Sequence, residues 1–133
     1  DTNVFIYVFE EHPEWGEKAK KLLQQIESGK YEAVVSALTL TELLVKPIRE
    51  GNRALEKQYK LLFSHFPHLQ TIPLDFRVAE SAAYIRGYYN IKTPDAIIVA
   101  TAIASGADLL ITQDLRLQSI REISCIQLES FEG

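Results

Sequence analysis

The chain has 133 residues, which fits a single domain that is long enough to bury a hydrophobic core. Hydrophobic residues make up 47% of it, an ordinary share for a globular protein, so extensive disorder is excluded. The net charge of −4 argues against a protein that coats nucleic acid without specificity. It does not exclude a nuclease, because carboxylates that bind a metal count as negative in the sequence and are neutralised by the ion.

The sequence also limits where the protein works. No apolar run is long enough to span a bilayer, and no secretory signal is visible. Cys125 is the single cysteine, so a disulfide within the chain is excluded, and its apolar neighbours are typical of a small core residue. We therefore expect a protein of the reducing cytoplasm that does not enter the membrane.

The first half of the chain alternates helical and strand-like segments. Residues 14–28 place apolar side chains at helical spacing, and Gly29 marks the end of that helix. Val34 and Val35 predict a short buried strand. In chain order, the predicted elements are a short helix over 3–10, a helix over 14–28, a strand over 32–37, a helix over 38–45 that ends before Pro47, a helix over 52–66 and a strand over 69–73.

The second half continues the same alternation. Asp75 is predicted to cap a helix over residues 76–89. Thr93 is expected as the N-cap, and Pro94 as the first residue, of a helix that is apolar almost all round and should be buried. That helix is predicted over 96–105, ending at Gly106, and is followed by strands over 109–112 and 124–128.

Strands that alternate with helices imply a parallel sheet with helices on both faces. We therefore expect residues 1–133 to form one α/β domain, built as a three-layer α/β/α sandwich around a central, mostly parallel sheet. The segment 2–9 starts directly after an acidic residue, and we expect a further strand ahead of Asp1.

Four acidic residues lie at the ends or starts of these predicted core elements, namely Asp1, Glu42, Asp95 and Asp114. A carboxylate at the edge of an apolar run costs free energy unless something pairs with it. In open α/β sheets, ligands bind beyond the carboxyl ends of the strands, where most of these acids are expected. Mg²⁺ and Mn²⁺ prefer such oxygen ligands, so the pattern predicts a metal site for phosphoryl transfer or hydrolysis.

Two of the acids have an ordinary explanation when each is taken alone, and Asp1 cannot be judged alone because the residues before it are not given. Asp95 is typical of the first turn of a helix, and Asp114 of a turn after a strand. Glu42 is harder to explain, because it interrupts the apolar residues Leu40 and Leu43 on a helix that is expected to be buried. The joint occurrence of the four acids is what indicates a shared partner.

Other chemistries find less support. The three histidines do not have zinc-ligand spacing, and no cysteine cluster accompanies them. The sequence has no Gly-rich phosphate loop and no Gly-x-Ser-x-Gly elbow. A phosphate-transferring aspartate nucleophile would need a second acid two positions after Asp1, where Asn3 stands instead. An α/β signalling domain with a phosphorylated aspartate would need a paired acidic pocket and a lysine after a late strand, and neither is evident after residues 124–128.

At these residues the chain resembles the PIN domain family, most closely its single-domain ribonuclease toxins of the VapC type. The matching segments, in the family's order, are Asp1-Thr2-Asn3, Thr41-Glu42-Leu43, residues 93–102 and residues 110–114. The third segment is the most specific, and the resemblance covers essentially the whole chain. Two features differ: the family has a hydrophobic strand before its first Asp, and it often has Asn where Gln113 stands.

The resemblance implies an endoribonuclease that depends on Mg²⁺ or Mn²⁺. It implies that Asp1, Glu42, Asp95 and Asp114 form the catalytic metal cluster. Asn3 and Thr112 would be supporting groups that orient the carboxylates or a water. It further implies a homodimer and an inhibitory antitoxin partner.

An RNA substrate must be held beside this negative cluster. We expect basic residues near the acids to contact its phosphates, and the candidates are Lys46, Arg49, Arg53, Arg86, Lys92 and Arg116. Tyr84, Tyr88 and Tyr89 are candidates either for stacking on bases or for packing at a dimer interface.

Two other functions stay open at this point. One is a structure-specific nuclease that acts on DNA flaps or on ribosomal RNA precursors, although such proteins usually carry extra modules. The other is a degenerate PIN domain that binds proteins, against which the presence of all four acids argues.

Overall fold

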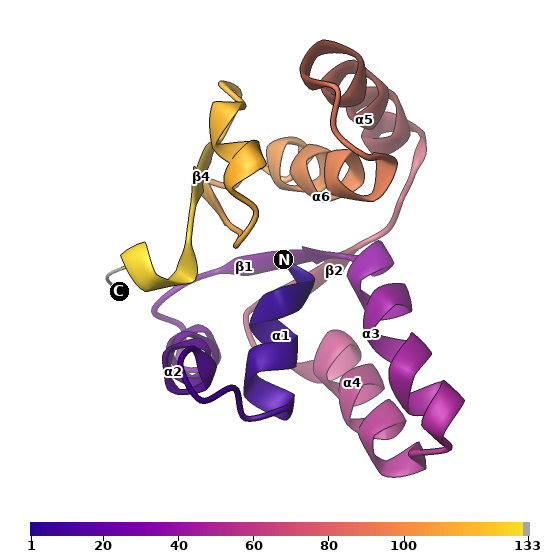
Figure 1. The fold of residues 1–133 in the computed structure, drawn as a ribbon, viewed down its shortest axis with the longest axis vertical. Helices are drawn as coiled ribbons and strands as arrows, with labels where there is room; N and C mark the ends of the chain where they lie inside the picture. The colour runs from indigo at the N-terminus through magenta and orange to yellow at the C-terminus, as the bar shows by residue number, and fades with distance from the viewer. Residues whose placement is uncertain (132–133) are drawn as a thin grey trace.

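The computed structural model describes residues 1–131 (Figure 1). Its elements follow one another as α1 (Thr2–Phe9), α2 (Gly16–Glu27), β1 (Ala33–Ser36), α3 (Ala37–Glu50), α4 (Arg53–His65), β2 (Leu69–Ile72), α5 (Phe76–Tyr89), α6 (Thr93–Ala104), β3 (Leu109–Ile111), the 3₁₀ turn η1 (Leu115–Ser119), β4 (Ser124–Ile126) and the 3₁₀ turn η2 (Leu128–Ser130). Helices α1 to α4 lie on one side of β1 and β2, and α5 and α6 lie on the other (Figure 1). The α/β class with helices on both faces is therefore confirmed.

The strands pair in parallel, as predicted, but as two separate pairs. β1 pairs with β2, with Ala33 opposite Leu69, and β3 pairs with β4, with Leu109 opposite Ser124. Within residues 1–131 these are two two-stranded sheets and not one continuous sheet. Beside β3, the Ile111 carbonyl accepts a hydrogen bond from the Asp1 amine at 2.8 Å. The strand expected ahead of Asp1 lies outside the sequence and stays a prediction.

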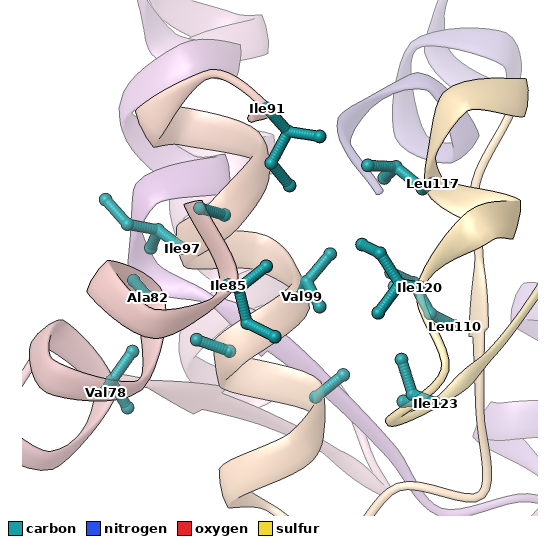
Figure 2. Packing of buried hydrophobic residues seen from close by; sticks show 13 residues of the cluster. Val78, Ala82, Ile85, Ile91, Ile97, Val99, Leu110, Leu117, Ile120 and Ile123 are labelled. Carbon is teal, nitrogen blue, oxygen red and sulfur yellow. The ribbon is translucent and has the colours of Figure 1, made fainter. Parts of the chain in front are cut away.

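Two hydrophobic clusters form the core. One gathers α1 to α4 and β1, together with Leu128 from the C-terminal segment. The other gathers α5, α6, β3 and the segment around η1. Figure 2 shows this second cluster, in which Ile85 and Ile120 flank the fully buried Val99 of α6. The prediction that α6 is an internal helix is confirmed, and each buried side chain of this size contributes about 1.5–3 kcal/mol.

Two predicted helix boundaries are wrong. α3 does not end before Pro47 but continues to Glu50, because the proline ring is buried in the core and the helix closes one turn later at Gly51, whose φ of 66° provides a left-handed cap. α6 begins at Thr93, so Lys92 and not Thr93 is its N-cap. The predicted bounds of α5 are confirmed, and Asp75 caps it by accepting a hydrogen bond from the Val78 amide at 2.9 Å.

Across residues 1–131, every helix is too short or too polar to cross a bilayer.

Candidate metal-binding carboxylate site

The four predicted acids come from four different segments of the fold. Asp1 is the N-cap of α1, and its Oδ1 accepts a hydrogen bond from the Asn3 amide at 3.0 Å. Asp95 stands in the first turn of α6, and Asp114 is the N-cap of η1, three residues after the end of β3. Glu42 lies in α3, the helix that follows β1. Helix N-termini favour negative charge, which suits Asp1 and Asp95.

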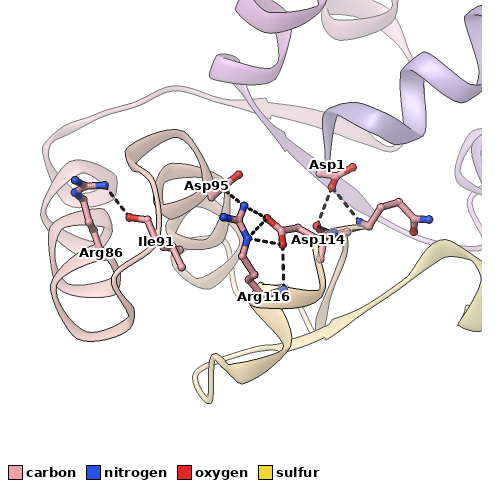
Figure 3. A network of polar contacts seen from close by, with 8 residues as sticks. Asp1, Arg86, Ile91, Asp95, Asp114 and Arg116 are labelled. Carbon is pink, nitrogen blue, oxygen red and sulfur yellow. Dashed lines mark hydrogen bonds and ion pairs between the residues drawn. The ribbon is translucent and has the colours of Figure 1, made fainter.

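Asp95 and Asp114 are joined by a cation from the same chain. The Arg116 guanidinium contacts both oxygens of Asp114, with Nη2 at 2.6 Å from Oδ2 and Nε at 3.0 Å from Oδ1. Its Nη2 also lies 3.7 Å from Oδ2 of Asp95 (Figure 3). Both aspartates are partly buried, whereas the Arg116 side chain is 63% exposed. We call Asp95 and Asp114, which Arg116 joins, the arginine-linked pair.

Asp1 and Glu42 are held by neutral donors. Oδ2 of Asp1 accepts hydrogen bonds from the Thr112 hydroxyl at 2.8 Å and from the Gln113 amide at 3.3 Å. Oε1 of Glu42 accepts one from the Thr2 hydroxyl at 2.6 Å. Thr2 follows Asp1 directly, so α1 brings these two carboxylates toward each other. We call Asp1 and Glu42, with these partners, the neutral-donor pair.

Thr112 connects the two pairs. Its hydroxyl donates to Asp1 and also accepts a hydrogen bond from the Asp114 amide at 3.1 Å. The side chain is only 1% exposed, so both bonds are shielded from water. A buried hydroxyl with both roles satisfied fixes the start of α1 against the end of β3.

The charges of the four acids influence one another. The pKa of Asp95 is raised, first by burial and then by the negative charge of Asp114, with a smaller contribution from Glu42. The pKa of Asp114 is lowered, chiefly by the hydrogen bond from the Arg116 side chain. Burial lowers the pKa of the Asp1 amine to about 6, and the charge of Glu42 opposes this shift. The negative charge of Glu42 therefore acts on the pKa of both Asp95 and the Asp1 amine, although Glu42 itself is exposed on α3.

The chemistry of the donor set fits a hard divalent cation, because all four acids supply carboxylate oxygens from separate segments. The arrangement is not a preformed cage. Among residues 1–131, no three His, Cys, Asp or Glu side chains are placed so that they could hold a metal ion together. The guanidinium of Arg116 contacts two of the acids that such an ion would need.

The other predicted site residues lie at different distances from the acids. Asn3 is exposed and offers its backbone amide to Asp1, while Arg86 Nη1 donates to the Ile91 carbonyl at 2.8 Å and supports the loop before α6. Lys46 forms an ion pair with Glu10. Lys92 lowers the pKa of both Asp95 and Asp114, so it lies within electrostatic range of them. Arg49 and Arg53 are exposed near the C-terminal end of α3.

Sequence reasoning missed two partners of the acids. Thr2 was not singled out, and its bond to Glu42 joins residues 40 positions apart, a distance at which no local pattern gives a signal. For Arg116 the sequence predicts a phosphate contact, which stays a prediction, and gives no expectation of the hydrogen bonds that its guanidinium donates to Asp114. The Asp-x-Arg spacing at the start of η1 was the available signal, because a residue two positions after an N-cap can fold back onto it.

Comparison with known proteins decides the family. The family model that describes the PIN domain matches residues 1–123. The chain belongs to the PIN domain family. All four acids fall within the matched residues, and the resemblance predicted from the sequence is confirmed. A search of curated proteins found no significant match.

Solved structures share the fold of this PIN domain. A toxin–antitoxin complex from Klebsiella pneumoniae is similar with a TM-score of 0.73 and 24% identity, covering 96% of this chain and 94% of the other. VapBC2 from Rickettsia felis, bound to a DNA fragment from its promoter, is similar with a TM-score of 0.75 and 18% identity over 96% and 95%. FitAB bound to the IR36 DNA fragment gives 0.75 and 22% over 100% and 96%. At these identities the likeness establishes the fold.

Proposed function

We propose that this PIN domain is a metal-dependent endoribonuclease that acts as the toxin of a toxin–antitoxin pair. The observation that carries the proposal is the linkage of the acids through Thr112, whose hydroxyl binds Asp1 and the amide of Asp114. The fold's likeness to toxin–antitoxin proteins supports the biological role. PIN domains are generally nucleases, which supports hydrolysis of a phosphodiester.

In this proposal Asp1, Glu42, Asp95 and Asp114 are the catalytic residues and hold Mg²⁺ or Mn²⁺. When bound, such a cation supplies activation of a water molecule and stabilisation of charge on the attacked phosphate. Thr112 orients Asp1 from within the core, and Asn3 fixes the other oxygen of Asp1 through its amide. Such orienting groups matter, because a carboxylate that turns freely binds a metal less well.

The predicted basic residues differ in how well they are placed to contact an RNA phosphate. Lys92 is exposed and within electrostatic range of Asp95 and Asp114, which makes it the strongest candidate for a phosphate contact. Arg49 and Arg53 are exposed as well. Lys46 forms an ion pair with Glu10, and Arg86 donates to the Ile91 carbonyl, so each must leave its partner before it can contact RNA.

The change Lys92→Ala should weaken RNA binding. It should also make the binding constant depend less steeply on salt concentration, by about the amount that one phosphate contact contributes. Unchanged binding over a salt series would remove Lys92 from the interface.

A homodimer is proposed on the surface of α5. Tyr84 and Tyr88 are 61% and 80% exposed and stack with ring centroids 6.4 Å apart. With Glu80, Ala83 and Gly87 they line a surface hollow. A Cβ on Gly87 would meet nothing within 4 Å, so the isolated subunit gains nothing from glycine there, although glycine within a helix costs about 1 kcal/mol. A second copy of the chain that packs closely against this hollow would explain both the exposed tyrosines and the glycine within the helix.

The dimer is tested with Gly87→Leu and Tyr88→Ala, measuring mass in solution by light scattering. Filling the hollow with leucine should yield a monomer that is as stable as the native chain or more so, because leucine is the better helix former. Lys21 is exposed on α2, and Lys21→Ala serves as a surface control. A native chain that is monomeric at all concentrations would contradict the dimer.

An antitoxin is the partner that the fold likeness suggests, and its encounter with the toxin is expected in the cytoplasm. The helices α3 and α4 expose apolar side chains at Val45, Ile48 and Leu61. The test is expression of this chain with and without the protein encoded next to it. Growth arrest that the neighbour relieves supports a toxin, and arrest that also occurs with Asp95→Asn argues against a nuclease toxin.

The nuclease itself is tested by cleavage of a mixed RNA pool with Mg²⁺, Mn²⁺ or EDTA. The native chain is compared with Asp95→Asn, and Asp108→Asn serves as a matched control because Asp108 is an exposed aspartate outside the site. Cleavage that requires metal, persists in the control and is lost in Asp95→Asn supports the proposal. Cleavage of flap or precursor substrates alone would instead identify a structure-specific nuclease.

One observation favours a second function, a degenerate PIN domain that binds proteins. Among residues 1–131 the acids do not form a ready metal cage, and Arg116 engages two of them. A folded protein that neither cleaves RNA nor binds Mn²⁺ would support this alternative.

A further inference from the structure

The arginine-linked pair combines two acids with a cation that can be replaced. Asp95 and Asp114 are two of the residues that would hold a divalent cation, and Arg116 contacts both of them, at Oδ2 of Asp95 and at both oxygens of Asp114. The guanidinium is planar and forked, so it matches the Asp114 carboxylate with two parallel hydrogen bonds. A divalent cation held by these carboxylates would therefore compete with the guanidinium for their negative charge and for several of their lone pairs.

We propose that Arg116 is an internal counterion of the carboxylate site, which holds Asp95 and Asp114 in the metal-free protein and is displaced when a divalent cation binds. The inference rests on the proposed metal dependence and specifies how this site is regulated. In this proposal the observed metal affinity reflects the difference between the free energy of metal binding and the free energy of the contacts that Arg116 makes with the same carboxylates.

The local structure permits this exchange. The backbone amide of Arg116 donates to Oδ1 of Asp114 at 3.0 Å, which caps η1 independently of the guanidinium. The Asp114 amide is held by the Thr112 hydroxyl at 3.1 Å. The turn that carries Asp114 therefore stays fixed when the side chain of Arg116 leaves. Because that side chain is 63% exposed, its movement opens no part of the core.

The electrostatics agree with the exchange. Asp95 lies within range of the negative charges of Asp114 and Glu42, and Arg116 and Lys92 oppose them. Removing the guanidinium leaves this repulsion less compensated, and a divalent cation then relieves more of it. Displacement would also release the guanidinium beside the site, where it becomes available to a phosphate of the RNA. The proposed role of Arg116 in RNA binding would then depend on bound metal.

The test measures Mn²⁺ binding at low ionic strength, by electron paramagnetic resonance of free Mn²⁺ and by calorimetry. The variants are Arg116→Ala and Arg116→Lys, with Arg121→Ala as a control that removes the same charge from an exposed arginine. Arg116→Ala should bind Mn²⁺ about threefold more tightly than the native chain, the scale of displacing one exposed ion pair. Arg116→Lys should fall between them, since lysine lacks the fork, and Arg121→Ala should match the native chain.

A second measurement follows the exchange directly in the native protein. The Nε–H resonance of Arg116 is recorded by NMR as Mg²⁺ is added. It should move with the binding curve toward the position of a free arginine. Metal binding that leaves this resonance unchanged would overturn the displacement.

The outcomes separate this inference from the proposed function. If the native chain binds Mn²⁺ and Arg116→Ala binds it equally or more weakly, Arg116 organises the acids and the inference is wrong, while the ribonuclease stands. If neither protein binds Mn²⁺, both fail. If Arg116→Ala binds more tightly but neither protein cleaves RNA in the presence of metal, the counterion is supported and the ribonuclease fails.

Discussion

The two halves of the carboxylate site are held by different kinds of partner. In the neutral-donor pair, Asp1 and Glu42 accept hydrogen bonds from hydroxyl and amide groups, and their negative charge is not compensated by these bonds. In the arginine-linked pair, Asp95 and Asp114 share a guanidinium. The first pair is oriented without any charge compensation from these donors, whereas the single positive charge of Arg116 offsets part of the negative charge of the second pair and can leave.

This difference indicates how the site could tolerate four acids before a metal binds. Neutral donors fix geometry at little cost, because hydroxyl and amide dipoles satisfy the lone pairs without competing for the charge. A mobile cation lowers repulsion where two aspartates are partly buried together. Thr112 belongs to both halves through its bonds to Asp1 and to the Asp114 amide.

The largest effect should come from removing one ligand of the arginine-linked pair. We expect Asp114→Asn to lower metal-dependent RNA cleavage by more than about 100-fold, since loss even of groups that only orient metal ligands costs 10- to 100-fold. Cleavage rates of the variant and of Asp108→Asn give the comparison. An Asp114→Asn protein that keeps native activity would show that this half of the site is not catalytic.

The next largest effect should come from cutting the link between the halves. Thr112→Val keeps the shape but removes the hydroxyl, which leaves the Asp114 amide without its buried acceptor and should lower the free energy of unfolding by about 1–3 kcal/mol. Activity should fall about 10-fold or more, because Asp1 loses its orienting donor. Chemical denaturation and cleavage rates measure both. Thr112→Ser retains the hydroxyl, and a serine variant as damaged as the valine one would assign the loss to packing.

A small effect is expected at Glu42. Thr2→Val removes the hydroxyl that donates to Glu42 at the surface, where water can replace it. Cleavage should fall only about twofold to fivefold, and stability should change by less than about 0.5 kcal/mol. A loss as large as that of Thr112→Val would mean that both donors of the neutral-donor pair are equally necessary.

Sequence patterns predicted the parts of this molecule that local physics controls. The bounds of α5 follow from the Asp75 cap, and α6 is internal because its residues are apolar on every side. Pro47 misled the prediction for α3, because its burial inside the fold outweighs the missing amide. Burial of that kind is decided by tertiary packing and leaves no local signal.

For the candidate site, the sequence indicates which residues to propose but not which of them contact one another. The four acids and the supporting Thr112 were named from their positions and from the family resemblance. The bond from Thr112 to Asp1 joins residues 111 positions apart, so its existence depends on the fold and not on any pattern near either residue. The contact between Arg116 and Asp95 likewise depends on how α6 packs beside β3.

The most direct test of the central claim is to locate a bound metal. Crystals grown with Mn²⁺ are measured at an X-ray wavelength at which manganese scatters anomalously. The account predicts one or two peaks among the carboxylates of Asp1, Glu42, Asp95 and Asp114, with the Arg116 guanidinium moved off Asp114. A saturated crystal with no peak there, or with manganese bound elsewhere while Arg116 still holds Asp114, would contradict it.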